Sequence, residues 1–373
     1  MKFVCSATDI SEACQNVQRA ASQKATMPAI EGILIRAEEG TVHLTGYDLE
    51  VGIKTSVAAK VEEPGAVVIN AKYLCEILRK LPSSQVRIEA DERMMSSITS
   101  GEANFGIKGI SPEDYPELPS VTGGYPIEIK QGLLRDMVRQ TIFAVSTNET
   151  KLVHKGIKVE VADNNIKLIA VDGYRMAIRS EDIDYKGEEL SFVVPSKTFS
   201  EVVKLINDPE KIINLGIGKR HIVFDVADYQ IVSRLLDGEF LNYRTIIEQN
   251  NLESSQTTVR FKTREFIDSI ERTALVISDR IKTPLKVAFS PGSVRVSTQT
   301  DIGSASDRFD AEVGGAALEI GFNNRLLLEA MRACETDEAY MKLNGPVAPA
   351  FILPLQGDSF LYLVLPVKMN AAS

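Results

Sequence analysis

The chain has 373 residues, a formal net charge of −9, 44% hydrophobic residues and 25% charged residues. This composition is typical of a globular protein, and the length allows two or three domains. No apolar run approaches the roughly 18 residues of a membrane span, and the start MKFVCSATD has too few apolar residues for a secretory signal. The negative charge argues against a protein that grips nucleic acid electrostatically, because affinity for phosphates usually comes from a basic surface.

The cysteines and histidines indicate a reduced, metal-free protein. Cys5, Cys14, Cys75 and Cys334 form no CxxC pair, and the three histidines are scattered along the chain. We therefore expect a cytoplasmic protein with buried free thiols, no metal site and no cofactor.

One strand pattern occurs three times, at Gly32–Val51, Gly156–Met176 and Leu285–Ala305. Each copy is an alternating apolar strand, a tight turn, a second alternating strand and then an Asp. The turns are Glu39-Gly40, Asn164-Asn165 and Pro291-Gly292, which are residue types that accept hairpin dihedrals, and the aspartates are Asp48, Asp172 and Asp301. A period of about 125 residues indicates three tandem copies of a small domain.

Two amphipathic helices are expected in each third, because apolar residues recur at helical spacing, as at Ile10, Cys14 and Val17. The expected helices, in chain order, cover residues 8–22, 71–81, 131–145, 196–207, 263–277 and 323–335. The second helix of each third follows a short strand, so each third consists of two β-α-β-β-β halves. The sequence predicts an α+β protein with six helices on antiparallel sheets and domains at 1–124, 125–252 and 253–373. The linkers are Gly123-Gly124-Tyr125-Pro126 and the polar run Gln249–Thr258.

The polar faces of these helices carry basic residues, while the remainder of the chain is strongly acidic. The residues are Arg19, Lys72, Arg79, Lys80, Arg135, Arg139, Lys197, Lys204, Arg264, Arg272, Arg325 and Arg332. Two interpretations are open: solvated helix faces of mixed charge, or one surface formed by all six helices that faces a polyanion.

No catalytic motif is present. The sequence lacks a nucleophile elbow, a Walker loop and a dinucleotide fingerprint, and LGIGK at 215–219 is interpreted as a turn between strands. The repeated aspartates could suggest carboxylate chemistry, but their place at a strand end in every copy favours a structural role in turns.

Several short strings, in this order and at this length, identify the chain as resembling the bacterial DNA polymerase III sliding clamps, the β subunits that act as processivity factors. They are MKF at the start, TMP at 26–28, LTGYDLE at 44–50, DGYRMA at 172–177, DGEF at 237–240, EIGFN at 319–323 and LPV at 365–367. The resemblance covers essentially the whole chain.

This resemblance implies three clamp domains per chain and a head-to-tail homodimer closed into a ring around duplex DNA. The ring would hold DNA without sequence preference and would tether the replicative polymerase and the clamp loader through short peptide motifs. No membrane contact and no enzymatic activity are implied.

The resemblance also implies functional residues. The partner-peptide pocket would comprise His154, Val171, Gly173, Tyr174, Arg175, Met176, Leu241, Thr245, Ile246, Pro349, Leu363, Leu365, Pro366, Val367, Lys368 and Met369. Several family members carry Pro and Arg where this chain has Leu241 and Thr245. The DNA-facing residues would be Lys24, Lys72, Arg79, Lys80, Arg135, Arg139, Lys151, Lys197 and Lys204, and the dimer interface would join Phe105 and Ile107 to Leu275 and Val276.

From the residues alone, the terminal run Leu363, Leu365, Val367 and Met369 is an alternating apolar strand, which could present one face to a peptide or be an ordinary core strand. Two other classes of protein remain as alternatives. One is a hydrolase that uses Asp172 and Arg175, and the other is a β-rich scaffold that does not bind DNA.

Overall fold

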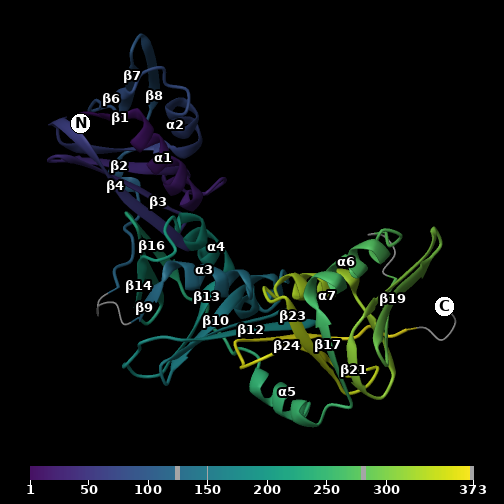
Figure 1. Cartoon of the computed structure of the whole chain (residues 1–373). Helices are drawn as coiled ribbons and strands as arrows, with labels where there is room; N and C mark the ends of the chain where they lie inside the picture. Colours follow the sequence, from purple (N-terminus) through teal and green to yellow (C-terminus); the bar gives the residue numbers. More distant parts are fainter. Residues whose placement is uncertain (122–126, 149, 279–282, 370–373) are drawn as a thin grey trace. The chain divides into compact units, whose positions relative to one another are not determined.

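The computed structural model describes residues 1–121, 127–148, 150–278 and 283–369 (Figure 1). The chain forms two compact units. The N-terminal unit comprises Met1–Leu134 and Lys197–Leu235, and the C-terminal unit comprises Arg135–Ser196 and Leu236–Ser373. The expected linker at 123–126 lies outside the described residues, and the three domain boundaries stay a prediction.

The expected β-α-β-β-β order is confirmed in all three thirds. The first third contains β1 (Lys2–Ser6), α1 (Ala7–Val17), β2 (Gly32–Glu38), β3 (Thr41–Tyr47) and β4 (Val51–Glu63), then β5 (Gly65–Asn70), α2 (Ala71–Leu78), β6 (Gln85–Ala90), β7 (Met95–Ser100) and β8 (Ala103–Lys108). The second contains β9 (Ile127–Lys130), α3 (Gln131–Arg139), β10 (Gly156–Ala162), β11 (Asn165–Val171) and β12 (Arg175–Asp182), then β13 (Leu190–Pro195), α4 (Ser196–Leu205), β14 (Ile212–Ile217), β15 (His221–Val226) and β16 (Tyr229–Arg234).

The last third repeats this order with one added strand. It contains β17 (Thr257–Lys262), α6 (Thr263–Ala274), β18 (Leu285–Ser290), β19 (Ser293–Thr300), β20 (Gly303–Asp310) and β21 (Glu312–Gly315), then β22 (Leu318–Phe322), α7 (Asn324–Arg332), β23 (Glu338–Leu343), β24 (Ala350–Pro354) and β25 (Phe360–Val364). A seventh helix, α5 (Tyr243–Gln249), was not expected, because its seven residues are too few for a clear helical period. Helix α5 ends at Gln249, the first residue of the expected linker Gln249–Thr258, and the end of that linker already belongs to β17.

The sheets are antiparallel. In the N-terminal unit a 12-stranded sheet runs in the order β8-β7-β6-β1-β4-β16-β15-β14-β9, with β2, β3 and β5 attached beside this path. In the C-terminal unit a nine-stranded sheet runs β13-β10-β11-β12-β25-β24-β23-β17-β21, and a four-stranded sheet runs β20-β19-β18-β22. Within each unit, therefore, a strand of one third pairs with a strand of the next.

Each helix buries its apolar stripe against a sheet. Ile10, Cys14 and Val17 of α1 are fully buried, and the helix packs against β1, β3 and β4. The helices end earlier than expected; α1, for example, gives way at Gln18 to a 3₁₀ turn. All four cysteines are buried and free, and burial raises the pKa of the Cys5 and Cys75 thiols to about 12. No helix in the described part of the chain has the length and apolar character to cross a membrane.

Two of the three repeated aspartates close turns as expected. Asp48 Oδ1 accepts hydrogen bonds from the backbone N–H groups of Glu50 and Val51, and Asp172 Oδ1 accepts the equivalent pair from Tyr174 and Arg175. In the third copy the assignment to Asp301 is wrong by one residue. There Thr300 Oγ1 accepts from the N–H of Ile302, so Thr300 occupies the capping position.

Two other expected turns are also displaced. The second hairpin turns at Asp163 and Asn164, both with positive φ, and Asn165 already belongs to β11. The segment 215–219 is mostly strand, since β14 continues to Ile217. In both places the residue types indicate a turn, but the neighbouring strand is longer than expected by one or more residues because its backbone hydrogen bonds continue.

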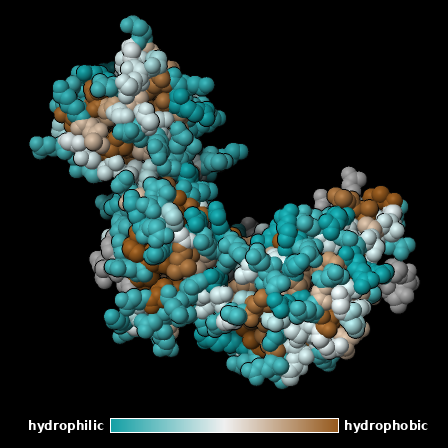
Figure 2. All heavy atoms as spheres, in the orientation of Figure 1, coloured by the Kyte–Doolittle hydropathy of each residue, from teal (hydrophilic) through white to brown (hydrophobic). Residues whose placement is uncertain are grey.

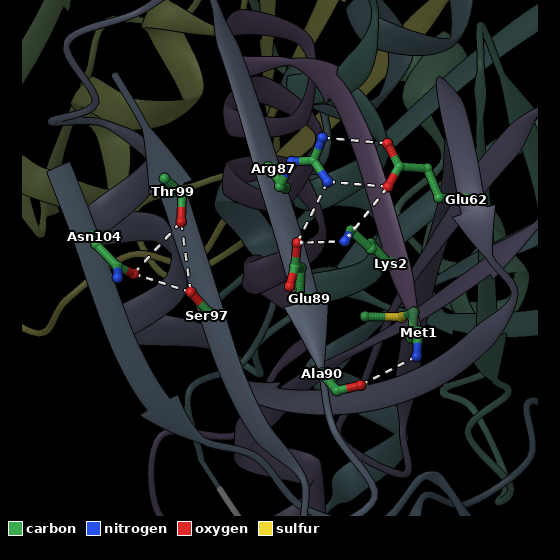
Figure 3. Close-up of polar contacts among 9 residues, drawn as sticks. All are labelled: Met1, Lys2, Glu62, Arg87, Glu89, Ala90, Ser97, Thr99 and Asn104. Carbon is green, nitrogen blue, oxygen red and sulfur yellow. Dashed lines mark hydrogen bonds and ion pairs between the residues drawn. The ribbon is translucent and has the colours of Figure 1, made fainter. Parts of the chain in front are cut away.

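The sheet face of the N-terminal unit that points away from its helices is polar around the first strand (Figure 3). Arg87 pairs with Glu62 and Glu89, and Lys2 pairs with the same two carboxylates at 3.6 and 3.2 Å. Towards β8, the Asn104 Oδ1 atom accepts a hydrogen bond from Ser97 at 2.9 Å. This part of the face is therefore dominated by paired charges and hydroxyl and amide groups.

Candidate functional site

The corresponding face of the nine-stranded sheet in the C-terminal unit carries an apolar cluster. Since side chains alternate across a strand, every second residue of β11, β12, β24 and β25 lies on this face. They form a cluster with one residue of α5, namely Ile169, Val171, Met176, Ile178, Tyr243, Phe351 and Leu363. Phe240, Ile246, Ile247, Leu252 and Leu365 pack against the edge of the cluster and are only partly buried.

The segment 240–252 is held over this face at both ends. At its start, Tyr243 Oη and Arg244 Nη2 donate hydrogen bonds of 2.7 and 2.6 Å to Glu160 Oε2 on β10. At its end, Lys342 Nζ on β23 donates to the Leu252 carbonyl at 2.9 Å. The apolar side of α5 is thereby fixed beside Met176 and Leu365.

The strand end at 171–176 and the terminal strand are direct neighbours in one sheet. Met176 pairs with Leu363 in the register of β12 and β25, and Leu365 N–H donates to the Tyr174 carbonyl at 2.8 Å. The two strands are therefore joined edge to edge, with no cleft between their backbones. Their backbone groups are already hydrogen-bonded here, so a partner would be held by side chains and not by adding a strand.

A tight turn exposes the residues at the mouth of this site. Gly173 has φ +91°, which favours glycine, and Tyr174 beside it is 66% exposed. Leu241 at 38% and Thr245 on α5 are also exposed. Exposed Tyr174 and Leu241, together with half-buried Leu365 and Ile246, provide apolar surface around a buried Met176. We name this set the Met176 groove.

Arg175 does not belong to the Met176 groove, because it points to the opposite face of the sheet. Its guanidinium donates to Asp172 Oδ2 at 2.8 Å and to Glu329 on α7, and it lies 5.3 Å from the centre of the Phe143 ring. Burial of Glu329 would raise its pKa, but hydrogen bonds from Arg175 and Arg325 outweigh burial and lower the pKa of this carboxyl. Arg175 is thus a packing residue that joins the strand to α7.

The chain's last described residues also leave the groove. The expected alternating strand is wrong beyond Val364, where β25 ends. Val367 N–H donates to the Gly321 carbonyl of β22 at 2.8 Å, and a Cβ on Gly321 would lie 2.7 Å from Met369 Cγ. Val367 and Met369 therefore lie against β22; half-buried Pro366 links Leu365 to this contact, and exposed Lys368 lies between Val367 and Met369.

Two predicted residues flank the groove. Pro349 precedes Ala350, which pairs with Val364 where β25 ends. His154 is buried with its ring centre 5.3 Å from that of Phe240, and burial, together with Lys151, lowers the pKa of the imidazole. His154 thus supports the segment that carries Leu241.

A hollow of about 700 Å³ on the same sheet face was missed by sequence reasoning. It is lined by residues such as Tyr243, Ile247, Leu353 and Leu361, and none of the sixteen predicted pocket residues lines it. The only signal for it in the sequence is the apolar Ile246-Ile247 pair, which is too short to predict the helix that forms its wall.

The predicted DNA-facing residues are placed on the surface, with one half-buried. Lys24, Lys72, Arg79 and Lys80 of the N-terminal unit and Arg139 and Lys151 of the C-terminal unit are exposed. Lys197 pairs with Asp48, Lys204 with Glu201 at 2.8 Å, and the half-buried Arg135 with Asp136 at 3.0 Å.

Phe105 and Ile107 lie half-buried on β8, and Leu275, at the end of α6, is 84% exposed. Figure 2 shows hydrophobic surface at this end of α6. Within residues 1–121, 127–148, 150–278 and 283–369, no three His, Cys, Asp or Glu side chains gather closely enough to hold a metal ion.

Three family models match consecutive parts of the chain: the N-terminal domain of the DNA polymerase III beta subunit at residues 1–119, its central domain at 128–242 and its C-terminal domain at 253–368. The chain belongs to the DNA polymerase III beta subunit family. This membership decides against the hydrolase and the scaffold without DNA, since proteins of this family are non-enzymatic DNA clamps.

Individual relatives agree over the full length. The beta sliding clamp of Bacillus subtilis is 29% identical over 380 residues, which covers 99% of this chain and 100% of the relative. A solved structure of a putative DNA polymerase III beta subunit from Eubacterium rectale is 31% identical, with a TM-score of 0.95 over 99% of this chain and 100% of that one. The sliding clamp from Bartonella birtlesii, solved with bound griselimycin, is 27% identical with a TM-score of 0.90 over 99% and 100% of the two chains.

The pairing of Arg175 with Glu329 predicts a pH dependence of stability. Because the pKa of Glu329 is lowered in the folded chain, its contribution is present above its ordinary value of 4.5 and is lost as the pH falls through the lowered pKa. We expect the free energy of unfolding to fall less steeply below pH 4.5 in Glu329→Gln than in the unsubstituted chain, measured by denaturant titration at several pH values.

The matched control is Glu271→Gln. Glu271 forms an exposed pair with Arg332 at 2.7 Å, and exposed pairs contribute little to stability. If both variants gave the same pH profile, the assignment of this dependence to Glu329 would be wrong.

Proposed function

We infer that this chain is a DNA sliding clamp: a head-to-tail homodimer that encircles duplex DNA and tethers the replicative polymerase. One observation carries the inference beyond family membership. The strand pairing that joins one third to the next occurs twice within the chain, and the two strands needed for a third such pairing lie at sheet edges. These are β8 and β20, each bonded on one side only among the described strands.

The two internal pairings have the same register. Val51 and Gly52 of β4 pair with Ser233 and Val232 of β16. Arg175 and Met176 of β12 pair with Val364 and Leu363 of β25 in the equivalent positions. The hairpin that leads into β20 closes with the pair Thr300–Gly303, and the hairpin that leads into β8 closes with Ser100–Ala103. Counting from these closing pairs assigns each residue of β20 and β8 to its equivalent in the two internal pairings.

Applied to two chains, this register places Gly303 opposite Ile107, Ser304 opposite Gly106 and Ala305 opposite Phe105. The sheet faces of the two strands also match. Asp307 of β20 accepts a hydrogen bond from Arg272 of α6, so Asp307 lies on the helix side of its sheet, and Ala305, two residues earlier, lies on the same side. Phe105 and Ile107 would then lie on the side of exposed Leu275 and half-buried Val276. A head-to-tail contact of this kind closes a ring when the rotation per domain is right, and three domains in each of two chains give pseudo-sixfold closure.

The acidic net charge fits retention by encirclement. Several of the proposed DNA-facing cations are exposed, yet Lys197, Lys204 and Arg135 are each paired with a carboxylate. A weakly positive lining allows the clamp to slide, because few counterions are released at any one position. We place Lys24, Lys72, Arg79, Lys80, Arg139 and Lys151 towards DNA as well, and the protein in the cytoplasm.

The Met176 groove is the proposed docking site for the polymerase and for the clamp loader. It offers apolar surface with few polar demands, which suits an extended peptide in which a polar residue is followed by Leu and an aromatic residue. Since one groove would serve both partners, a peptide that fills it should inhibit loading as well as processive synthesis. The tether acts by keeping the polymerase at a high effective concentration near the primer end.

Ring closure is predicted to depend on Leu275 and Val276. Replacing both by Asp should give folded monomers near 41.0 kDa in sedimentation, because burying each side chain contributes about 1.5–3 kcal/mol and a buried charge reverses this gain. A double variant that still sediments as a dimer would show that this contact does not hold the ring.

The proposed register gives a sharper control for this interface. Gly106→Cys combined with Ser304→Cys should be linked between chains by a short bismaleimide, and the native cysteines, which are buried, should not interfere. Gly106→Cys with Asp310→Cys should not be linked, because six residues along a strand span about 20 Å. Efficient linking of the second pair would overturn the register.

DNA retention is predicted to be topological. After loading onto a circular duplex, the clamp should stay bound at high salt and should be released when the circle is cut, whereas binding to open-ended duplex should be weak and steeply salt dependent. Gel filtration of labelled clamp on nicked circles, before and after linearisation, measures this. Equal retention on both forms would contradict encirclement.

Peptide binding is predicted to depend on Met176 and Leu365. Truncating either to Ala should cost about 1–3 kcal/mol of affinity for a labelled polymerase tail peptide, measured by fluorescence anisotropy, while the dimer persists. Met95→Ala is the matched control, since this exposed methionine lies in the other unit. Unchanged affinity in both groove variants would place the peptide elsewhere.

A further inference from the structure

The hollow of about 700 Å³ in the C-terminal unit lies beside the Met176 groove, with α5 between them. Its floor is made by side chains of four neighbouring strands. Ile178 and Leu361 are cross-strand partners on β12 and β25, and Leu353 and Tyr340 are partners on β24 and β23. An apolar stripe therefore crosses the sheet next to the groove, and we name this site the Leu361 hollow.

The floor of the Leu361 hollow is open to solvent and is not a gap inside the core. Leu361, Leu353 and Tyr340 are each only half-buried, and so is Leu355 in the β24–β25 turn that forms one wall. The volume lies within the range of about 300–1,000 Å³ that is usual for ligand sites. A large apolar side chain placed here would cover surface that is now in contact with water.

Helix α5 forms another wall and joins the hollow to the groove. Ile246 belongs to the groove, and the next residue, Ile247, lines the hollow. Both pack on the same buried cluster, to which Tyr243 of this helix belongs. A helix is about 10 Å across, so roughly five extended residues, at about 3.3 Å each, suffice to lead a bound chain from one site over α5 to the other.

Lys167 gives the hollow a preference for an anionic group. This half-buried residue of β11 lines the hollow, and within the part of the chain that the structure describes its ammonium has no ion-pair or hydrogen-bond partner. Its cross-strand neighbour Glu160 is already shared by Lys158 at 2.7 Å and Arg244 at 2.6 Å. A carboxylate is therefore the polar group that fits beside Lys167.

The acidic residues of the lining do not cancel this preference. Glu248 on α5 and Asp358 in the β24–β25 turn are both exposed. Water and salt screen exposed charges, whereas a half-buried ammonium interacts more strongly with a charge brought next to it.

We propose that the Leu361 hollow is a second docking site, filled by a further segment of the same partner polypeptide that occupies the Met176 groove. This segment carries a large apolar side chain for the floor and a neighbouring acidic residue for Lys167. The inference rests on the proposed function of the groove. Two weak contacts joined by a short linker bind more tightly than either alone, because the second contact is intramolecular. The hollow thus distinguishes partners that carry this segment from partners that offer only the groove motif.

The probes are synthetic peptides, and tryptophan fluorescence can report on them because the chain contains no tryptophan. The groove peptide is Gly-Gln-Leu-Phe-Gly. Two extended peptides join Asp-Trp-Leu to it through Gly-Ser-Gly-Ser-Gly, one at the amino end and one at the carboxyl end, so that both chain directions are covered. Affinity is measured by titration calorimetry on the whole dimeric chain, and burial of the probe's Trp by the shift of its emission.

At least one extended peptide is expected to bind the unsubstituted chain about tenfold more tightly than the groove peptide, with its Trp emission shifted to shorter wavelength. Lys167→Glu and Leu355→Gln should each remove most of this gain and leave the affinity for the groove peptide unchanged. Lys186→Glu is the matched control, since this exposed lysine undergoes the same charge change and does not line the hollow.

Equal affinity of all three peptides for the unsubstituted chain, or a gain that survives in both hollow variants, would overturn the second site while leaving the groove intact. No binding of the groove peptide would refute the Met176 groove itself, so the two failures are distinguishable.

Sedimentation separates a partner segment from a second copy of the chain as the occupant. All three variants are expected to sediment like the unsubstituted chain. A change of mass in Lys167→Glu and Leu355→Gln, but not in Lys186→Glu, would assign the hollow to a contact between chains and overturn the inference.

Discussion

The organisation of this protein depends on one antiparallel strand pairing between successive thirds. β4 with β16 and β12 with β25 use the same register and the same turn, in which a carboxylate caps two backbone N–H groups. Because register fixes which side chains share a face, repeating it also repeats the layout of a helix side and an outer side. The remaining edges, β8 and β20, are complementary by the same rule. In the proposed dimer, assembly between chains continues the strand pairing that the chain already uses within itself.

The outer faces of the two units carry different side chains. Around β1 the outer face of the N-terminal sheet carries the ion pairs of Lys2, Glu62, Arg87 and Glu89 (Figure 3). At the β4–β16 junction a Cβ on Gly52 would lie 2.1 Å from Leu118 Cδ2, so Leu118 packs over this glycine. The outer face of the C-terminal unit carries the apolar cluster around Met176, and α5 packs against that cluster.

The sequence predicts the repeat and the helices well because both depend on periodicity that each third carries locally. It fails where residue type does not decide a local turn and where a long-range contact fixes a segment. Thr300 replaces Asp301 as the turn cap because a hydroxyl and a carboxylate can both accept a backbone hydrogen bond, so residue type alone does not place the turn. The helix α5 is too short to have a period, and Tyr243 and Arg244 fix it through Glu160, a residue far away in sequence. The family resemblance assigned Arg175 and Val367 to the groove, but the pleat of β12 and the Gly321 carbonyl direct them elsewhere.

The same separation of roles explains how an acidic chain can serve as a clamp on a polyanion. Encirclement requires no net affinity, so the basic residues of the helices need only prevent repulsion. Pairs such as Lys204 with Glu201 and Arg272 with Asp307 leave dipoles in place of free charges, and their fields decay within a short distance in salt. A stronger positive lining would hold phosphates at fixed positions and oppose movement along the duplex. In the proposed ring, closure by strand pairing and weak contact with DNA have complementary roles: the first prevents escape, and the second allows the clamp to slide.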